Sequence, residues 1–158
     1  DLFCPFFTCK AQVIFDNSLI DSELHSTVSS HGSRAVKAHG AKGAMQMALE
    51  GYRELFDSWL PYYRSVKADA FCLQRTLLKI MSQLDDTCVI HRVGYERAQQ
   101  VKTEAGEIAC QAGPEGSVMP DLTGHLKGMC ERYAAEGISP GGAADMLALT
   151  IFMDSILN

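Results

Sequence analysis

The chain has 158 residues, of which 47% are hydrophobic and 21% are charged, and its formal net charge is −5. This length and composition suit one compact domain with its own core. An acidic chain without a basic stripe argues against a nucleic-acid partner, because neutralising phosphates requires lysine and arginine. We find no apolar run long enough for a membrane span and no signal peptide, so we expect no membrane partner.

The six cysteines are scattered along the chain and form neither a C-x-x-C pair nor a cluster with histidine. Such cysteines are typical of reduced thiols in a cytoplasmic protein, where most of them fill space in the core. The opening stretch DLFCPFFTC is apolar and lacks an initiator methionine. We therefore expect the chain to be the C-terminal part of a longer one.

Helical spacing of apolar residues dominates the chain, and no alternating strand pattern stands out. The first half predicts a helix over 8–24, a short helix over 33–40 that Gly40 stops, and a helix over 44–59. The third helix is expected to end before Pro61, because the residue before a proline disfavours helical geometry.

The second half predicts four more helices, over 68–84, 95–112, 119–137 and 140–157. In the first of them the apolar stripe comprises Phe71, Leu77, Leu78, Met81 and Leu84. About six or seven helices with short loops indicate an all-α fold, a compact multi-helix bundle forming one domain over 1–158.

The last predicted helix begins unusually, within the stretch GISPGGAADMLALTIFM. Ser139 stands where an N-cap belongs and Pro140 fits the first helical position. Gly141 and Gly142 follow, although glycine is unfavourable inside helices. Either a phosphate approaches their free N–H groups, or the helix packs closely against a neighbour. Asp145 could stabilise the helix dipole or hold a metal beside a phosphate.

The stretch LDDTCVIHR is the second candidate site. Asp85 and Asp86 follow an apolar helix at its C-terminal end, where the helix dipole disfavours carboxylates. Compensation could come from Mg²⁺, which binds carboxylate oxygens together with substrate phosphates, or from a bidentate pair with Arg92. The plain alternative is a solvated loop with an ordinary salt bridge.

The stretch SSHG places His31 before Gly32 in a polar loop. A histidine there could bind a phosphate or transfer a proton, although a lone loop histidine more often does neither. The other histidines lack metal-ligand spacing to it.

Taken in order, SSHGSRAVKAHGAKGA, MSQLDDTCVIHR and GISPGGAADMLALTIFM resemble the C-terminal half of the triphosphoribosyl-dephospho-CoA synthase family. In that family a T-H-G segment precedes a Y-G-x-x-G segment, then D-T-N-x-x-x-R, then a terminal S-P-G-G-S/A-A-D-L-L-A helix. The order and spacing agree from about residue 30 onward, and the terminal motif is the most specific.

The resemblance implies an all-α cytoplasmic enzyme whose substrates are ATP, together with Mg²⁺, and 3'-dephospho-CoA. Such an enzyme joins the 2'-hydroxyl of dephospho-CoA to C1 of the ATP ribose and releases adenine. The product is the precursor of the prosthetic group of citrate lyase or malonate decarboxylase acyl carrier protein. A homo-oligomer or an N-terminal half would complete the assembly.

The carboxylates expected to be catalytic are Asp85, Asp86 and Asp145. They would stabilise an oxocarbenium-like sugar, and Asp86 with Asp145 would hold the metal. The residues expected to bind the nucleotide are His31, Gly32, Arg92, Ser139, Gly141 and Gly142.

Several positions depart from the family pattern, which has an arginine and two glutamates where this chain has methionines and a leucine. The departures are Ser30, Met45, Met47, Leu49, Cys88 and Val93. The family's T-P-K-P-G and N-T-H-K-G segments are also missing. The chain is therefore expected to be a fragment of the enzyme or a diverged relative. The alternatives are a non-catalytic helical relative that binds a nucleotide or a partner protein, and a plain interaction domain.

Overall fold

The computed structural model describes residues 40–41, 43–111 and 122–157, and this part of the chain is helical without any strand. The predicted all-α fold is therefore confirmed. The predicted helix over 8–24 lies outside the described residues, as does all of 33–40 except Gly40. No helix in the described ranges is both long enough and apolar enough to cross a membrane.

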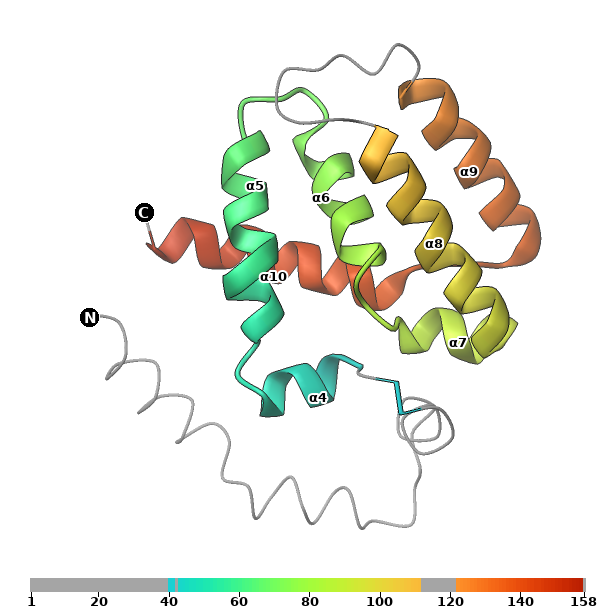
Figure 1. The fold of residues 1–158 in the computed structure, drawn as a ribbon, viewed down its shortest axis with the longest axis horizontal. Coiled ribbons are helices and arrows are strands. Elements are labelled where there is room, and N and C mark those ends of the chain that lie inside the picture. Colours follow the sequence, from blue (N-terminus) through green and yellow to red (C-terminus); the bar gives the residue numbers. More distant parts are fainter. Residues whose placement is uncertain (1–39, 42, 112–121, 158) are drawn as a thin grey trace.

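Within residues 43–111 and within residues 122–157 the helices follow one another with short connections (Figure 1). In chain order they are α4 (Ala44–Leu49), the π-helix η1 (Leu55–Trp59), α5 (Leu60–Val66), α6 (Cys72–Met81), α7 (Thr87–Val93), α8 (Tyr95–Gln111), α9 (Leu122–Glu136) and α10 (Gly141–Leu157).

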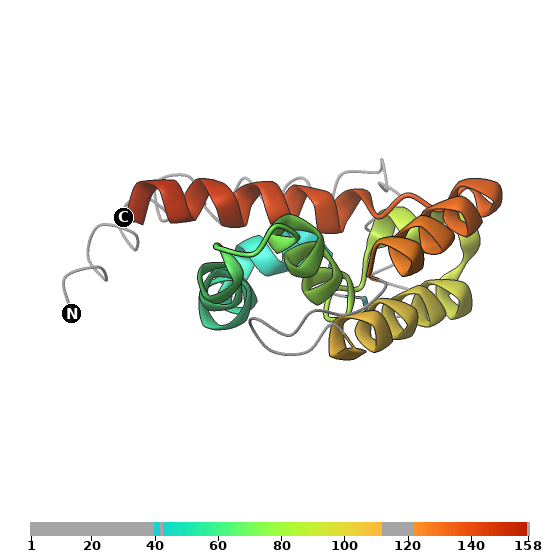
Figure 2. The same cartoon turned by 90° about the horizontal axis from the view of Figure 1, so that it is seen from above.

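Helix α6 lies at the centre of the bundle, in contact with α5, α8 and α10. Helix α10 runs as a long rod across α5 and α6 on one face of the molecule, and its first turns contact α7 (Figure 2). Seven large side chains at the meeting of these helices are fully buried: Leu55, Trp59, Thr76, Leu78, Ile80, Val89 and Thr150.

The segment predicted as one helix over 44–59 is divided in the structure. Gly51 and Tyr52 have positive φ angles of 76° and 53°, which end α4. The chain then continues through η1 into α5, so the prediction that the helix ends before Pro61 is wrong. Pro61 lies in the first turn of α5, after the wider π turn, where a proline is tolerated.

The predicted helix over 68–84 is shorter in the structure, where α6 covers Cys72–Met81. Its buried face carries Leu78 and Met81 as expected, but Ile80 is buried where Leu77 is only partly covered. Helices α8, α9 and α10 agree with their predictions within three residues. Helix α7 was not predicted, because seven residues are too few to show a period.

An ion cluster fastens the second half of α10 to α5. The buried carboxylate of Asp154 receives Arg64 Nε at 2.7 Å and Lys67 Nζ at 2.6 Å. The two cations hold the pKa of Asp154 below its ordinary value, Lys67 contributing most. Because α10 is tied to α5 here, its N-terminal turn is presented at a defined place beside α7.

Candidate functional site

Asp86 is the N-cap of α7. Its extended backbone precedes Thr87, and its Oδ1 accepts the N–H groups of Cys88 at 2.9 Å and Val89 at 3.4 Å. An aspartate in this position satisfies orphan donors of the first turn and complements the helix dipole. The unfavourable placement inferred from the sequence is thereby resolved, because Asp86 begins a new helix rather than ending the previous one.

The second oxygen of Asp86 reaches a different helix. Oδ2 accepts the N–H of Ala143 at 2.9 Å, within the first turn of α10. Helix α10 begins at Gly141, so its flanking residue is Pro140 rather than the predicted cap Ser139. Proline offers no capping side chain, and Asp86 supplies the missing acceptor from α7. One carboxylate therefore caps two helices.

The two glycines at the start of α10 are explained by how closely α7 approaches. A Cβ on Gly142 would lie 3.0 Å from Asp86 Oδ1 and 3.1 Å from Asp86 Cγ. A Cβ on Gly141 would lie 3.3 Å from the sulfur of Cys88. All of these distances are tighter than ordinary contacts. The two glycines therefore provide the space in which two helix N-termini meet.

The first N–H groups of α10 have partners inside the chain. Gly141 donates to the carbonyl of Ser139 at 2.9 Å, and Ala144 donates to that of Pro140 at 3.0 Å. Ala143 is bound by Asp86, and the Gly142 N–H donates to the Cys88 thiol, whose pKa burial raises overall although this contact opposes the rise. A phosphate at this helix end would have to displace one of these internal contacts.

A third segment meets the same place. Gly43, the N-cap of α4, is buried, and a Cβ there would lie 2.8 Å from Thr87 Cγ2. The segments around Gly43 and Gly142 are far from α7 in the sequence, yet both touch its N-cap or first turn. We call this meeting point the α7–α10 junction and define it as Gly43, Asp86–Cys88 and Ser139–Ala143.

The remaining predicted residues lie around the α7–α10 junction or outside the described residues. Asp85 points to α8, where Lys102 Nζ lies 2.8 Å away, and not toward α10. Arg92 is exposed and donates to the Gly137 carbonyl at 3.5 Å. Ser139 and Asp145 are exposed at the start of α10, and the charge of Asp145 acts on Cys88. His31 and Gly32 lie outside the described residues.

The carboxylates expected to hold a metal do not form a ligand set. Within the described ranges no three histidine, cysteine or acidic residues are grouped so that they could hold a metal ion. Asp86 already uses both oxygens on backbone N–H groups, while Asp85 pairs with Lys102. These residues on their own do not fit a resident Mg²⁺.

Cys88 stood out in the sequence only as a departure from the family pattern, and its place at the α7–α10 junction was not predicted. Desolvation raises the pKa of its thiol, and the charges of Asp86 and Asp145 raise it further. The thiol is therefore protonated at neutral pH. Thr87 and Gly43 were also missed as contacts. A capping signal was present in the sequence, because Asp86 precedes the apolar pair Val89 and Ile90.

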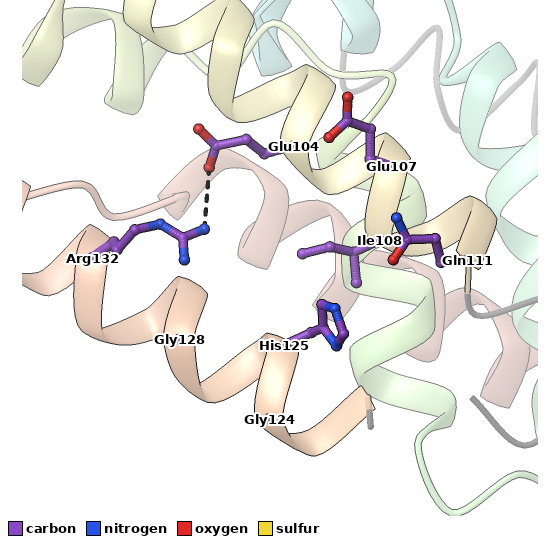
Figure 3. A pocket seen from close by; sticks show the side chains of 8 residues that line it. All are labelled: Glu104, Glu107, Ile108, Gln111, Gly124, His125, Gly128 and Arg132. Carbon is purple, nitrogen blue, oxygen red and sulfur yellow. Dashed lines mark ion pairs between the residues drawn. The ribbon is translucent and has the colours of Figure 1, made fainter. Parts of the chain in front are cut away.

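A separate hollow of about 400 Å³ lies between α8 and α9 (Figure 3). Glu104 on its wall is engaged by Arg97 at 2.6 Å, by the Tyr133 hydroxyl at 3.0 Å and by Arg132 at 3.8 Å. Burial is the largest cause of the raised pKa of Tyr133, and the hydrogen bond to Glu104 raises this pKa further. With Glu107 also on the wall, the hollow is poorly suited to a polyphosphate.

Comparison with known families shows to which family the chain belongs. Residues 8–158 match the model of the ATP:dephospho-CoA triphosphoribosyl transferase family, CitG. The chain belongs to this family. The resemblance drawn from the sequence motifs is thereby confirmed, and the α7–α10 junction is a feature of a CitG-family chain.

Curated relatives agree with this family. A protein of Azotobacter vinelandii is 34% identical over 144 residues, covering 87% of this chain and 48% of its own length. One of Pseudomonas syringae pv. syringae is 35% identical, covering 82% and 45%, and one of Pseudomonas fluorescens is 32% identical, covering 88% and 48%. Each is described as a probable 2-(5''-triphosphoribosyl)-3'-dephosphocoenzyme-A synthase. The chain thus spans about half the length of these relatives, and no solved structure matches it.

Proposed function

We propose that this chain carries out the transfer for which its family is named, at the α7–α10 junction. The 2'-hydroxyl oxygen of 3'-dephospho-CoA would bond to C1 of the ATP ribose while the bond from that carbon to adenine breaks. Adenine leaves, and its departing nitrogen takes up the proton that the 2'-hydroxyl loses. The observation that carries the proposal is that two distant segments, around Gly43 and Gly142, meet at the start of α7 in a chain of this family.

The α7–α10 junction offers suitable chemistry for such a transfer. Displacement at an anomeric carbon passes through an oxocarbenium-like state that a nearby carboxylate stabilises. Asp145 is the exposed carboxylate beside the α7–α10 junction, and Arg92 is the exposed cation on α7 that could meet phosphate. Ser139, Gly141 and Gly142 would line the path by which a nucleotide reaches Asp145 and Arg92.

We propose that Mg²⁺ reaches the protein bound to the triphosphate of ATP, as part of that substrate. The described residues provide no complete ligand set of their own, so phosphate and water oxygens would supply most of its coordination. Asp85 points toward Lys102, so its carboxylate would contribute only to the electrostatic field around the site. His31 and Gly32 remain proposed parts of the nucleotide pocket, and the cytoplasm is the proposed location.

The direct test is to incubate the 158-residue chain with ATP, Mg²⁺ and 3'-dephospho-CoA, and to measure released adenine by chromatography. We expect one adenine for each triphosphoribosyl adduct found by mass spectrometry, with no release when dephospho-CoA is omitted. Asp145→Asn should lower the turnover about tenfold or more, because a charge facing the cationic sugar is removed. Asp57→Asn, an exposed aspartate on η1, is the matched control and should leave turnover unchanged.

A folded chain that releases no adenine would contradict the proposal for this chain. Titration calorimetry with Mg²⁺ and ATP then separates the remaining alternatives. Binding without adenine release would indicate a non-catalytic relative that binds a nucleotide. Absence of binding would leave a helical interaction domain that keeps the family's fold.

A further inference from the structure

We propose that Asp86 is a positioning residue, which fixes the start of α10 against α7 and does not itself bind metal or substrate. The inference rests on the proposed function, because it states how the α7–α10 junction is held in shape for that reaction. It departs from the role that the sequence suggested for Asp86, which was a metal ligand.

The hydrogen bonds of Asp86 carry the first step of the argument. Asp86 as a residue is 8% exposed, and its carboxylate accepts three backbone N–H groups, from Cys88, Val89 and Ala143. Bonds from N–H donors to a charged carboxylate are among the stronger hydrogen bonds in proteins. A cation binding to Asp86 would have to displace them, and it would leave N–H donors of two helices without acceptors.

The first turn of α10 contains a buried N–H group that requires an acceptor. Ala143 is completely buried, so its N–H group has no access to water. A buried donor without an acceptor is costly, and Pro140 offers no side-chain acceptor of its own. Asp86 is the described side chain that accepts this N–H, and the absence of a Cβ atom on Gly142 is what allows it to come so close.

The surface beside Asp86 gives the third step. Ser139 and Asp145 are exposed on either side of the first turn of α10, and Cys88 is exposed on α7. The link from Asp86 to Ala143 sets how these two helix starts are aligned. A small displacement of reacting groups can lower a rate about a hundredfold, so alignment alone gives Asp86 a large effect.

The experiment compares three variants of the 158-residue chain. In Asp86→Ser the hydroxyl can still cap α7, but it is too short to reach Ala143. Asp86→Asn keeps the size with only one acceptor oxygen, and should be intermediate. The matched control is Asp57→Ser, because Asp57 is exposed on η1, away from the α7–α10 junction.

Amide hydrogen exchange provides a readout that does not depend on activity. In Asp86→Ser we expect exchange at Ala143 to accelerate about tenfold or more, while Cys88 and Val89 change less than about threefold. Asp57→Ser should leave all three amides unchanged. Should Asp86→Ser fail to fold, Gly142→Ala tests the same contact, because its methyl would press on both carboxylate oxygens of Asp86, 3.0 Å from Oδ1 and 3.2 Å from Oδ2.

Kinetics then separate positioning from metal binding. We expect Asp86→Ser to lower kcat about tenfold or more, with the Mg²⁺ concentration for half-maximal rate within about twofold of wild type and partial recovery in Asp86→Asn. Unchanged exchange at Ala143 in both Asp86→Ser and Gly142→Ala would overturn the proposal, as would a Mg²⁺ requirement raised about tenfold or more. If the wild-type chain releases no adenine, the proposed function fails while the exchange results still decide the role of Asp86.

Discussion

At the scale of single residues, the α7–α10 junction depends on side chains that are absent as much as on those present. Gly43, Gly141 and Gly142 each face a neighbour at a distance where a methyl group would be crowded. The sequence offered close packing as one explanation for the α10 glycines, and the contacts with Asp86 and Cys88 agree with it. It could not show which residues they pack against, because Asp86 and Ala143 are separated by 57 positions.

Gly43→Ala is expected to destabilise the protein by about 1–3 kcal/mol, because the added methyl would lie 2.8 Å from Thr87 Cγ2. Thr87→Ser removes that Cγ2 atom, so the double variant should lose less stability than the two single losses added together. Urea unfolding of the four chains measures this coupling.

The matched control is Gly106→Ala in α8, where the nearest atom to the new methyl is Ser82 Cβ at an ordinary 3.5 Å. There the substitution should stabilise the chain by about 0.4–1 kcal/mol, because it restricts the unfolded state. A loss at Gly106 equal to the loss at Gly43, or no coupling with Thr87, would show that the close approach is not what requires glycine at position 43.

At the scale of helices, the long elements could be predicted and the short ones could not. Helices α8 and α10 have many turns of apolar spacing with glycine or proline near their ends, which fixes their bounds. Helix α7 has seven residues, and the division between α4 and η1 depends on the backbone at Gly51 and Tyr52. These features follow from tertiary packing and leave no period in the sequence.

The ion cluster between α5 and α10 gives a prediction at this scale. The pKa of Asp154 is lowered in the folded state, so its contribution to stability is present above the unfolded value of about 3.9 and is lost as the pH falls through the lower folded value. Asp154→Asn should therefore lower the thermal midpoint at pH 7, and its difference from wild type should narrow at pH 3.

Thermal unfolding followed by circular dichroism at both pH values checks this. Asp57→Asn, an exposed aspartate on η1, should give the same midpoint as wild type at pH 7. A difference between Asp154→Asn and wild type that is equally large at pH 3 would mean that the charge of Asp154 is not what joins α10 to α5.

At the scale of the whole molecule, the motif segments identified the family, while the structure showed how two of them meet. The order of the segments predicted a shared site from resemblance alone, and the stretches around Gly43 and Gly142 do meet at the start of α7. The metal site expected at Asp86 and Asp145 does not appear among the described residues, because both oxygens of Asp86 accept backbone N–H groups, and the adjacent Asp85 points to α8 instead. The side chains of two residues that are adjacent in the sequence can point in different directions where a helix begins.

The central claim is that ATP binds at the α7–α10 junction, and mapping its binding tests this most directly. Backbone amide shifts of the labelled 158-residue chain are recorded while Mg²⁺ and ATP are added. The largest shifts are expected over residues 86–92 and 139–145, with smaller ones at Gly43. Largest shifts in the hollow between α8 and α9, around Glu107 and His125, would contradict the claim, as would a folded chain whose amides do not respond.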